Sequence, residues 1–146
     1  MEAKDIGITS THRVMNNAIR VALGSLSDLV RVDTPERWQG LERKVMVAVH
    51  PLSGAAAPTS FDLNTGRLCV MASRHRAGLV LVSRDHVRRS LETYIPAAEQ
   101  AVGRPDVTGR GQSDHWIFWN TIESEGRVVR LGSTRRDRSV REEALS

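Results

Sequence analysis

The sequence predicts an α/β protein with a mainly parallel sheet flanked by helices. Short apolar runs alternate with stretches of helical spacing, and short turns connect them, which is the pattern of a chain that winds around a parallel sheet. At 146 residues the chain suits one domain with a core of its own. Hydrophobic residues make up 40% and charged residues 26%, as in ordinary globular proteins.

Four apolar runs are expected to form strands, at residues 6–10, 29–33, 45–49 and 79–82. The run at 45–49 is almost continuously apolar, which is typical of a strand buried on both faces of a parallel sheet. Right-handed crossovers place the carboxyl ends of all parallel strands at one edge, where such folds build their sites.

Three helices are expected, at residues 13–23, 63–75 and 85–93. In the first, side chains at the spacing of one helix face are apolar and a glycine follows as C-cap. These residues are Val14, Ala18, Val21, Ala22 and Gly24. In the second, three apolar side chains share a face, namely Leu68, Met71 and Ala72.

The remaining segments are less regular. Residues 50–60 and 96–113 are rich in proline, glycine and small or polar residues, so both are expected to be loops. An aromatic cluster at 115–119 is expected to open a short helix, and Val128 with Val129 to form a closing strand. The resulting division is a core at 1–95, an extension with a loop, a short helix and a strand at 96–131, and a disordered basic tail at 132–146.

Arginine carries almost all of the positive charge. The net charge is +4 and the sequence pI is near 10.2, and Lys4 and Lys44 are the only lysines among 21 basic residues. The guanidinium fork pairs with two phosphate oxygens at once, so an arginine excess suits phosphate recognition. A GC-rich genome would give the same excess, so the charge supports a nucleic-acid partner without establishing one.

The composition excludes several classes of protein. A single cysteine, Cys69, rules out a disulfide framework and a cysteine-rich zinc site, and the five histidines show no metal-ligand spacing, so no metal site is expected. No apolar run approaches the ~18 residues that a membrane helix needs, and the polar residues 1–5 do not form a signal peptide. We therefore expect a cytoplasmic protein without a membrane partner. Cys69 is expected to be a core thiol, and Trp116 and Trp119 to pack rather than stack on bases.

The turn Gln39-Gly40-Leu41-Glu42 lies between two predicted strands. Glycine lets the backbone approach a ligand closely, and a carboxylate two residues on can accept hydrogen bonds from a ribose hydroxyl. Thr34 and Trp38 before it, and the apolar strand after it, make this tetrapeptide more specific than it is alone. The alternative is an ordinary turn between strands.

Two arginines, Arg67 and Arg74, lie at the start and the end of the second predicted helix. They are seven residues apart, about two helical turns, and so share a face. A fixed guanidinium can neutralise charge on a transferring phosphoryl group. The alternative is a solvated basic face of the helix.

Hydroxyl and basic side chains follow the first predicted strand, at Ser10, Thr11, His12 and Arg13. Hydroxyls at a strand end, followed by the free amides of a helix N-terminus, suit a nucleic-acid phosphate. The alternative is a plain junction between a strand and a helix.

The Ser10–Arg13 segment resembles motif IV of superfamily-one helicases, the Gln39–Glu42 turn motif V, and the helix with Arg67 and Arg74 motif VI. The resemblance is to the branch of the nonsense-decay helicases and the replication helicase-nucleases. The resemblance spans about residues 5–89 and implies a three-layer RecA-like domain of the P-loop NTPase type. It implies that Arg74 is an arginine finger that reaches the γ-phosphate of ATP. By the same resemblance, the nucleotide is also faced by Arg67, Gln39, Gly40 and Glu42.

The resemblance further implies that Thr34 and the four residues from Ser10 to Arg13 face the backbone of a single-stranded nucleic acid, with DNA favoured over RNA. In the first of the three motifs the chain departs from the family pattern, because Thr11 replaces a proline and Met15 a glutamine. The contact that the glutamine amide makes is therefore in doubt.

The sequence lacks two motifs that helicases use to bind ATP and Mg²⁺. It contains neither Gly-x-x-x-x-Gly-Lys-Ser/Thr nor an Asp-Glu pair after an apolar strand, groups that helicases of this kind carry on their first RecA-like domain. The resemblance thus implies a second motor domain, inactive alone, that shares ATP with a partner domain holding the phosphate loop and Mg²⁺. Two alternatives remain: a stand-alone nucleic-acid-binding module that has lost the motor role, and a different α/β nucleotide-binding enzyme.

Overall fold

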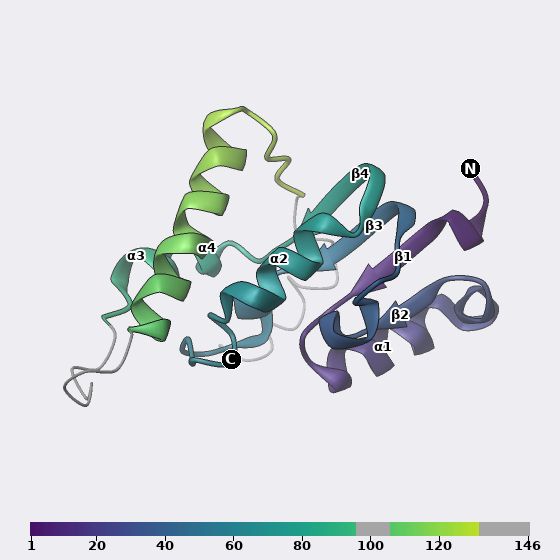
Figure 1. Cartoon of the computed structure of the whole chain (residues 1–146), viewed down its shortest axis with the longest axis horizontal. Coiled ribbons are helices and arrows are strands. Elements are labelled where there is room, and N and C mark those ends of the chain that lie inside the picture. Colours follow the sequence, from purple (N-terminus) through teal and green to yellow (C-terminus); the bar gives the residue numbers. More distant parts are fainter. Residues whose placement is uncertain (96–105, 132–146) are drawn as a thin grey trace, which may run out of the picture.

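The computed structural model describes residues 1–95 and 106–131. Its centre is a four-stranded sheet in the order β2-β1-β3-β4, in which every neighbouring pair is parallel, and helices flank it (Figure 1). The strands are β1 (Ile6–Thr9), β2 (Arg31–Asp33), β3 (Arg43–Val49) and β4 (His75–Val82). The predicted α/β class with a parallel sheet is therefore confirmed.

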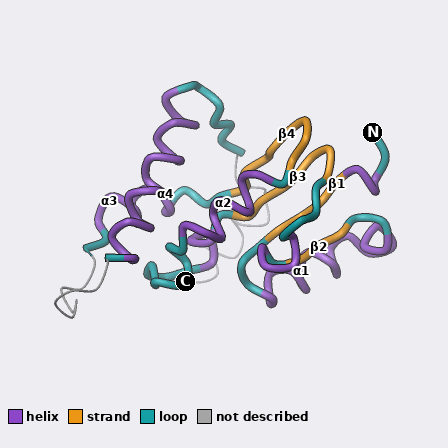
Figure 2. The backbone as a smooth tube through the Cα atoms, viewed as in Figure 1, coloured by secondary structure: helices purple, strands orange, loops and turns teal. Residues whose placement is uncertain are grey.

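As expected, α-helices follow the first, third and fourth strands, whereas β2 and β3 are joined through a 3-10 turn alone. The helices are α1 (Arg13–Leu23), α2 (Thr65–Ser73), α3 (His86–Thr93) and α4 (Val107–Ser124). Four short 3-10 turns fill the connections, namely η1 (Ala3–Asp5), η2 (Gly24–Asp28), η3 (Pro35–Trp38) and η4 (Pro51–Gly54). Figure 2 shows α3 and α4 together on one side of the orange strands, with α1 on another.

Because all strands run the same way, the sheet has two distinct edges. We call the edge where the strands begin the amino edge, at Ile6, Arg31, Arg43 and His75, and the edge where they end the carboxyl edge, at Thr9, Asp33, Val49 and Val82. The register aligns each edge: Thr9 lies opposite both Asp33 and Ala48, and Val49 lies opposite Val82.

One tight contact fixes the sheet beneath the amino edge. The indole of Trp38 is fully buried, and its Nε1 donates to the carbonyl of Ile8 at 3.2 Å. A Cβ atom at Gly7 would lie 2.5 Å from the Trp38 ring and 2.6 Å from the sulfur of Met46. Only glycine therefore lets Trp38 close over the middle of β1.

The second predicted helix and fourth predicted strand meet earlier in the chain than expected. The helix expected to end at residue 75 ends at Ser73, and β4 starts at His75 rather than at Leu79. Pairing with β3 draws these residues into the sheet, since Arg43 lies opposite His75. Arg74 is left as the single residue between α2 and β4.

The apolar stripe of α1 points away from the protein. Its predicted boundaries and its glycine C-cap are confirmed, and apolar residues at such spacing normally mark a buried face. Val14 and Val21 are instead each 82% exposed. The inward side of α1 instead combines the half-buried Met15, Ile19 and Leu23 with two polar residues. Asn16 donates to the carbonyl of Ser10 at 3.0 Å, and Arg20 binds the carbonyl of Val32.

The prediction that residues 45–49 are buried on both faces of the sheet was wrong. Met46 and Ala48 are fully buried, but Val47 is only half-buried. On β4, Val80 and Val82 are 50% and 47% exposed. Val80 lies opposite Val47, so the two share a face, and the helices cover that face only in part.

The C-terminal part differs most from its prediction. Instead of a loop to residue 113 and a short helix, residues 107–124 form the single helix α4, and 128–129 form no strand. Trp116 and Trp119 pack against the apolar cluster of Leu52, Leu63, Val87 and Leu91, which confirms their packing role. Cys69 is exposed, so the prediction of a core thiol was wrong.

The predicted tail at 132–146, and the part of the predicted loop at 96–105, lie outside the described residues. Among the helices that are described, none combines the length and the apolar character required to cross a membrane.

Candidate functional site

The predicted Gln39-Gly40-Leu41-Glu42 turn lies directly before β3, at the amino edge and not at the carboxyl edge, where the sequence pattern predicted the sites of such folds. The amide of Leu41 donates to the carbonyl of Trp38 at 3.1 Å, which closes the turn. Gly40 has a φ of 75°, a left-handed conformation that favours glycine. Gln39, Gly40 and Glu42 are all exposed. The turn is thus fixed in its backbone and open to a ligand or partner.

Arg74 is joined to this turn through the backbone. Its carbonyl accepts a hydrogen bond from the amide of Arg43 at 3.0 Å, and Arg43 directly follows Glu42. The guanidinium of Arg74 donates to the Ser73 hydroxyl at 2.9 and 3.2 Å, and it forms no ion pair within residues 1–95 and 106–131. Two segments that the sequence singled out separately therefore share the amino edge.

Two arginines stack on Trp38 at this edge, and one of them, Arg31, is ion-paired with Asp33 at 3.2 Å. The guanidinium carbons of Arg31 and Arg43 lie 5.3 and 5.5 Å from the centroid of the Trp38 ring. Both distances are within the range of a cation–π contact. The buried indole thus positions the first side chains of β2 and β3 at the amino edge, where the sequence offered no motif to find them.

The structure separates Arg67 from Arg74. Since α2 runs from the carboxyl edge back to the amino edge, seven residues set them roughly 10 Å apart along the helix axis. Arg67 is held at the carboxyl edge: its Nε donates to a Glu36 carboxylate oxygen at 2.6 Å, and its guanidinium lies 3.9 Å from the Phe61 ring centroid. The two arginines therefore do not lie at one edge, contrary to what their shared helix face suggested.

The hydroxyls of the Ser10 to Arg13 segment are largely turned inward at the carboxyl edge. Ser10 and Thr11 are buried; Ser10 Oγ accepts from the His12 amide at 3.3 Å, and the Thr11 hydroxyl has no partner in the described structure. Arg13 is exposed at the first position of α1. Thr34 is half-buried at the end of β2. His12 and Arg13 are thus the members of this segment with accessible polar groups.

Sequence analysis missed two residues of the carboxyl edge, Phe61 and Asp62. The buried Asp62 accepts from His12 Nε2 at 3.1 Å and from the Thr59 hydroxyl at 2.7 Å. Phe61 beside it is 43% exposed. Their only signal in the sequence is an aromatic residue and a carboxylate inside a segment otherwise rich in alanine, proline and small polar residues.

Two buried histidines support the carboxyl edge from beneath. His50 Nδ1 accepts from the Leu52 amide at 3.2 Å, so its Nε2 carries the proton and donates to His115 Nδ1 at 3.2 Å. His115 Nε2 is then a buried donor without a partner in the described structure. Burial lowers the pKa of His50 to about 3 and that of His115 to about 4. Both rings are neutral at physiological pH.

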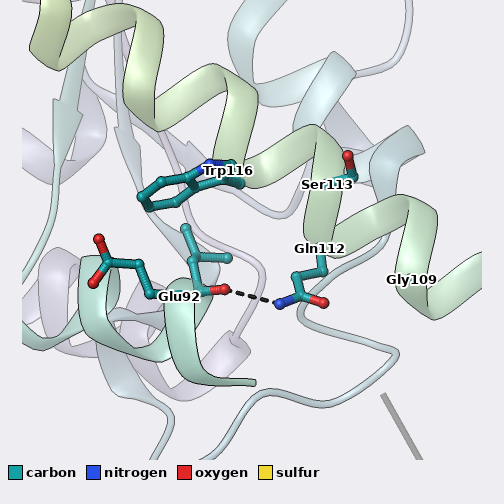
Figure 3. A pocket seen from close by; sticks show the side chains of 6 residues that line it. Glu92, Gly109, Gln112, Ser113 and Trp116 are labelled. Carbon is teal, nitrogen blue, oxygen red and sulfur yellow. Dashed lines mark hydrogen bonds between the residues drawn. The ribbon is translucent and has the colours of Figure 1, made fainter. Parts of the chain in front are cut away.

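A separate cavity of about 410 Å³ lies between α3 and α4 (Figure 3). The side-chain amide of Gln112 donates to the carbonyls of Leu91 and Tyr94 at 2.8 and 2.7 Å, which ties α4 to the end of α3. The indole of Trp116 forms another wall, near the carboxylate of Glu92. None of the residues predicted to be functional lines this cavity.

In the part of the chain that the structure describes, no group of three or more acidic, histidine or cysteine side chains could hold a metal ion. No family model matches the chain, and none of the curated proteins compared with it matches either. The functional argument therefore rests on the two edges of the sheet.

Proposed function

We propose that this chain is the second RecA-like motor domain of an ATP-dependent superfamily-one helicase or translocase, inactive without a domain that carries the phosphate loop. The observation that carries the proposal is the hydrogen bond between the Arg43 amide and the Arg74 carbonyl. It holds the Gln39–Glu42 turn and the candidate arginine finger together, as binding of one nucleotide requires.

ATP would lie between the amino edge and the partner domain. Gln39, Gly40 and Glu42 offer an amide, an open backbone and a carboxylate to the nucleoside, and Arg74 offers a guanidinium to the γ-phosphate. Mg²⁺ would be held by the partner, because its usual carboxylate ligands are absent from the sequence. Arg43, stacked on Trp38, would add positive charge to the edge before the partner docks.

The carboxyl edge would carry part of the track for single-stranded nucleic acid, with DNA favoured. The exposed Arg13 at the start of α1 can neutralise a phosphate, and the first amides of that helix can bind one. His12 and Thr34 add polar groups at neighbouring strand ends. Closure of two domains around ATP, and release after hydrolysis, would move the strand past this edge.

The direct test is turnover in a complex with a phosphate-loop domain. Arg74→Ala should reduce ATP hydrolysis by roughly 10³–10⁵, the range found for arginine fingers. Arg74→Lys should rescue poorly, because a point charge does not replace the planar fork. Arg89→Ala, on the exposed side of α3, is the matched control and should hydrolyse ATP normally.

Turnover near the wild-type rate in Arg74→Ala would refute the arginine-finger role. The isolated chain should hydrolyse no ATP, with or without nucleic acid. Sustained hydrolysis by the purified chain, abolished by a point change within it, would refute the shared-site proposal as a whole.

A second candidate is a stand-alone nucleic-acid-binding module. It is favoured by the construction of the carboxyl edge, where the pairs His12–Asp62 and Arg67–Glu36 form without any residue of the amino edge. Affinity for single strands that does not change when a phosphate-loop domain and ATP are added would support this candidate over the motor.

A further inference from the structure

The exposed ring of Phe61 is held in place at the carboxyl edge by an arginine. The Arg67 guanidinium carbon lies 3.9 Å from the ring centroid, and the same group donates to the Phe61 carbonyl at 3.3 Å. Phe61 as a whole residue nevertheless remains 43% exposed. An aromatic side chain that stays this exposed forgoes part of the free energy of apolar burial. Its fixed and exposed position points to a role in binding.

Arg67 is itself positioned by the segment that follows β2. Glu36 Oε1 accepts from Arg67 Nε at 2.6 Å. Partial burial of Glu36 favours its neutral form, but hydrogen bonds from its own backbone, from Arg67 and from Thr34 outweigh burial and lower the pKa of this carboxyl. Glu36 is therefore ionised at neutral pH and keeps the guanidinium over the ring.

On its other flank, Phe61 contacts the segment that precedes α1. The imidazole of His12 lies 5.7 Å from the ring, measured between centroids, at an interplanar angle of 39°. Asp62, the residue after Phe61, fixes this imidazole through its hydrogen bond of 3.1 Å. The aromatic ring is thus adjacent to His12, next to the exposed Arg13.

We propose that Phe61 is a stacking platform for a base of a single strand whose phosphates pass His12 and Arg13. The proposal rests on the nucleic-acid role of the carboxyl edge and adds a contact to the base, which that role does not include. Every base has a π face, so such a platform raises affinity without reading sequence. Arg67 adds positive charge beside it and restricts the motion of the ring before binding.

The test compares two fluorescent oligomers of equal length and charge, oligothymidine and its fully abasic analogue, binding to the full chain. Phe61→Ala should weaken oligothymidine binding by about 5- to 20-fold, the lower part of the range for one stacked base. It should leave binding of the abasic oligomer unchanged. Phe61→Tyr should restore affinity, whereas Phe61→Leu, apolar but without a π face, should not.

Leu29→Ala is the matched control for loss of an exposed apolar side chain, because Leu29 is 57% exposed beside the amino edge. It should bind both oligomers as the wild type does. Thermal melts of each variant report whether the fold is retained.

Three results would overturn the stacking role. In the first, Phe61→Ala binds oligothymidine as tightly as the wild type, while Arg13→Ala binds it more weakly. The carboxyl edge then binds phosphates, but Phe61 does not stack on a base. In the second, Phe61→Ala weakens both oligomers equally, so that the ring only supports the fold. In the third, the wild type binds neither oligomer, and the nucleic-acid role of the carboxyl edge fails with it.

Discussion

The amino and carboxyl edges of the sheet belong to the same strands but are built in opposite ways. At the amino edge, Gln39, Gly40 and Glu42 are exposed on a backbone that a buried tryptophan and one interstrand hydrogen bond keep in place. At the carboxyl edge most polar groups are bound to each other, as in the contact between His12 and Asp62.

This difference shows at which edge the charged side chains are already paired within the described structure. An exposed polar group without a protein partner is hydrated, so it costs little free energy. A buried polar group loses that hydration and needs a hydrogen-bond partner within the chain. Arg74 forms no ion pair among residues 1–95 and 106–131, while Arg67 is fully engaged with Glu36 and Phe61. Under the proposed function, the second domain would bind at the amino edge and the nucleic acid at the carboxyl edge.

The largest expected effect comes from filling the space beneath the amino edge. Gly7→Ala should lower the free energy of unfolding by about 3 kcal/mol, at the upper end of overpacking costs, because the new Cβ meets the Trp38 ring and the Met46 sulfur. Chemical denaturation measures the loss. Gly78→Ala is the control, since its Cβ would lie 4.0 Å from Val45 and should change stability by less than about 0.5 kcal/mol.

Acid should lower the free energy of unfolding through the two buried histidines beneath the carboxyl edge. Burial lowers the pKa of His50 to about 3 and that of His115 to about 4 in the folded state, below the usual histidine pKa of 6.5. The unfolded chain therefore binds more protons below pH 6.5, and stability is complete above that pH and falls as the pH decreases toward 4. The loss is at most about 1.4 kcal/mol per pH unit for each histidine.

Denaturation at pH 7.5 and pH 5 measures this dependence, and His115→Gln should remove part of it. Other charged groups act on the pair: Asp114 and Asp62 raise the pKa of His115, and His86 lowers that of His50. A free energy of unfolding that is equal at the two pH values would show that the histidines are not buried as a neutral pair.

A smaller effect on stability should distinguish the inward side of α1, which carries Asn16, from its exposed apolar stripe. Asn16→Ala removes a buried hydrogen bond to the Ser10 carbonyl beside the carboxyl edge and should cost about 1–2 kcal/mol of stability. Val14→Ser and Val21→Ser change side chains that are each 82% exposed, and should each alter stability by less than about 0.5 kcal/mol. A larger loss in the valine variants than in Asn16→Ala would show that the apolar stripe is buried after all.

The smallest expected effect is a gain in affinity. Glu36→Gln removes a negative charge next to the expected path of the phosphates and frees part of Arg67 to pair with them. Because the pair is partly solvated, single-stranded DNA should bind only about two- to threefold more tightly. Weaker binding would indicate that Glu36 matters more as the positioner of Arg67 than as a repulsive charge.

Local pattern was sufficient to predict the strands, the first three helices and the parallel arrangement. It failed where a tertiary contact outweighs the pattern. The stripe of Val14 and Val21 indicated a buried face, but α1 turns inward another face, on which Met15, Ile19 and Leu23 are half-buried. On that face Asn16 and Arg20 also bind backbone carbonyls. The length of α4 was missed because Gly109 and Gly111 suggest a loop, although the Asp106 side chain caps the helix at the Gly109 amide.

For the candidate site, the sequence motifs singled out the turn and Arg74. They did not predict which other residues lie close to the two edges. The stack of Arg31 and Arg43 on Trp38 joins residues of separate strands, and the contact of Phe61 with His12 joins residues 49 positions apart. Arg67 and Arg74 share a helix face, yet the two ends of that helix lie at different edges. Such proximities depend on the register of the sheet, which local spacing does not encode.

The central claim is that the two edges have separate tasks, and salt-dependent binding of single-stranded DNA tests it most directly. Two or three neutralised phosphates predict a log–log slope of about −1.4 to −2.1 for the full chain. Truncation before Gly132 removes the arginines at 135, 136, 138 and 141, and so measures the share of bulk charge. Within the truncated chain, Arg13→Ala should reduce the magnitude of the slope by about 0.7, and Arg74→Ala should leave it unchanged. Equal reductions by both variants, or loss of all binding on truncation, would contradict the division of the sheet into a nucleotide edge and a nucleic-acid edge.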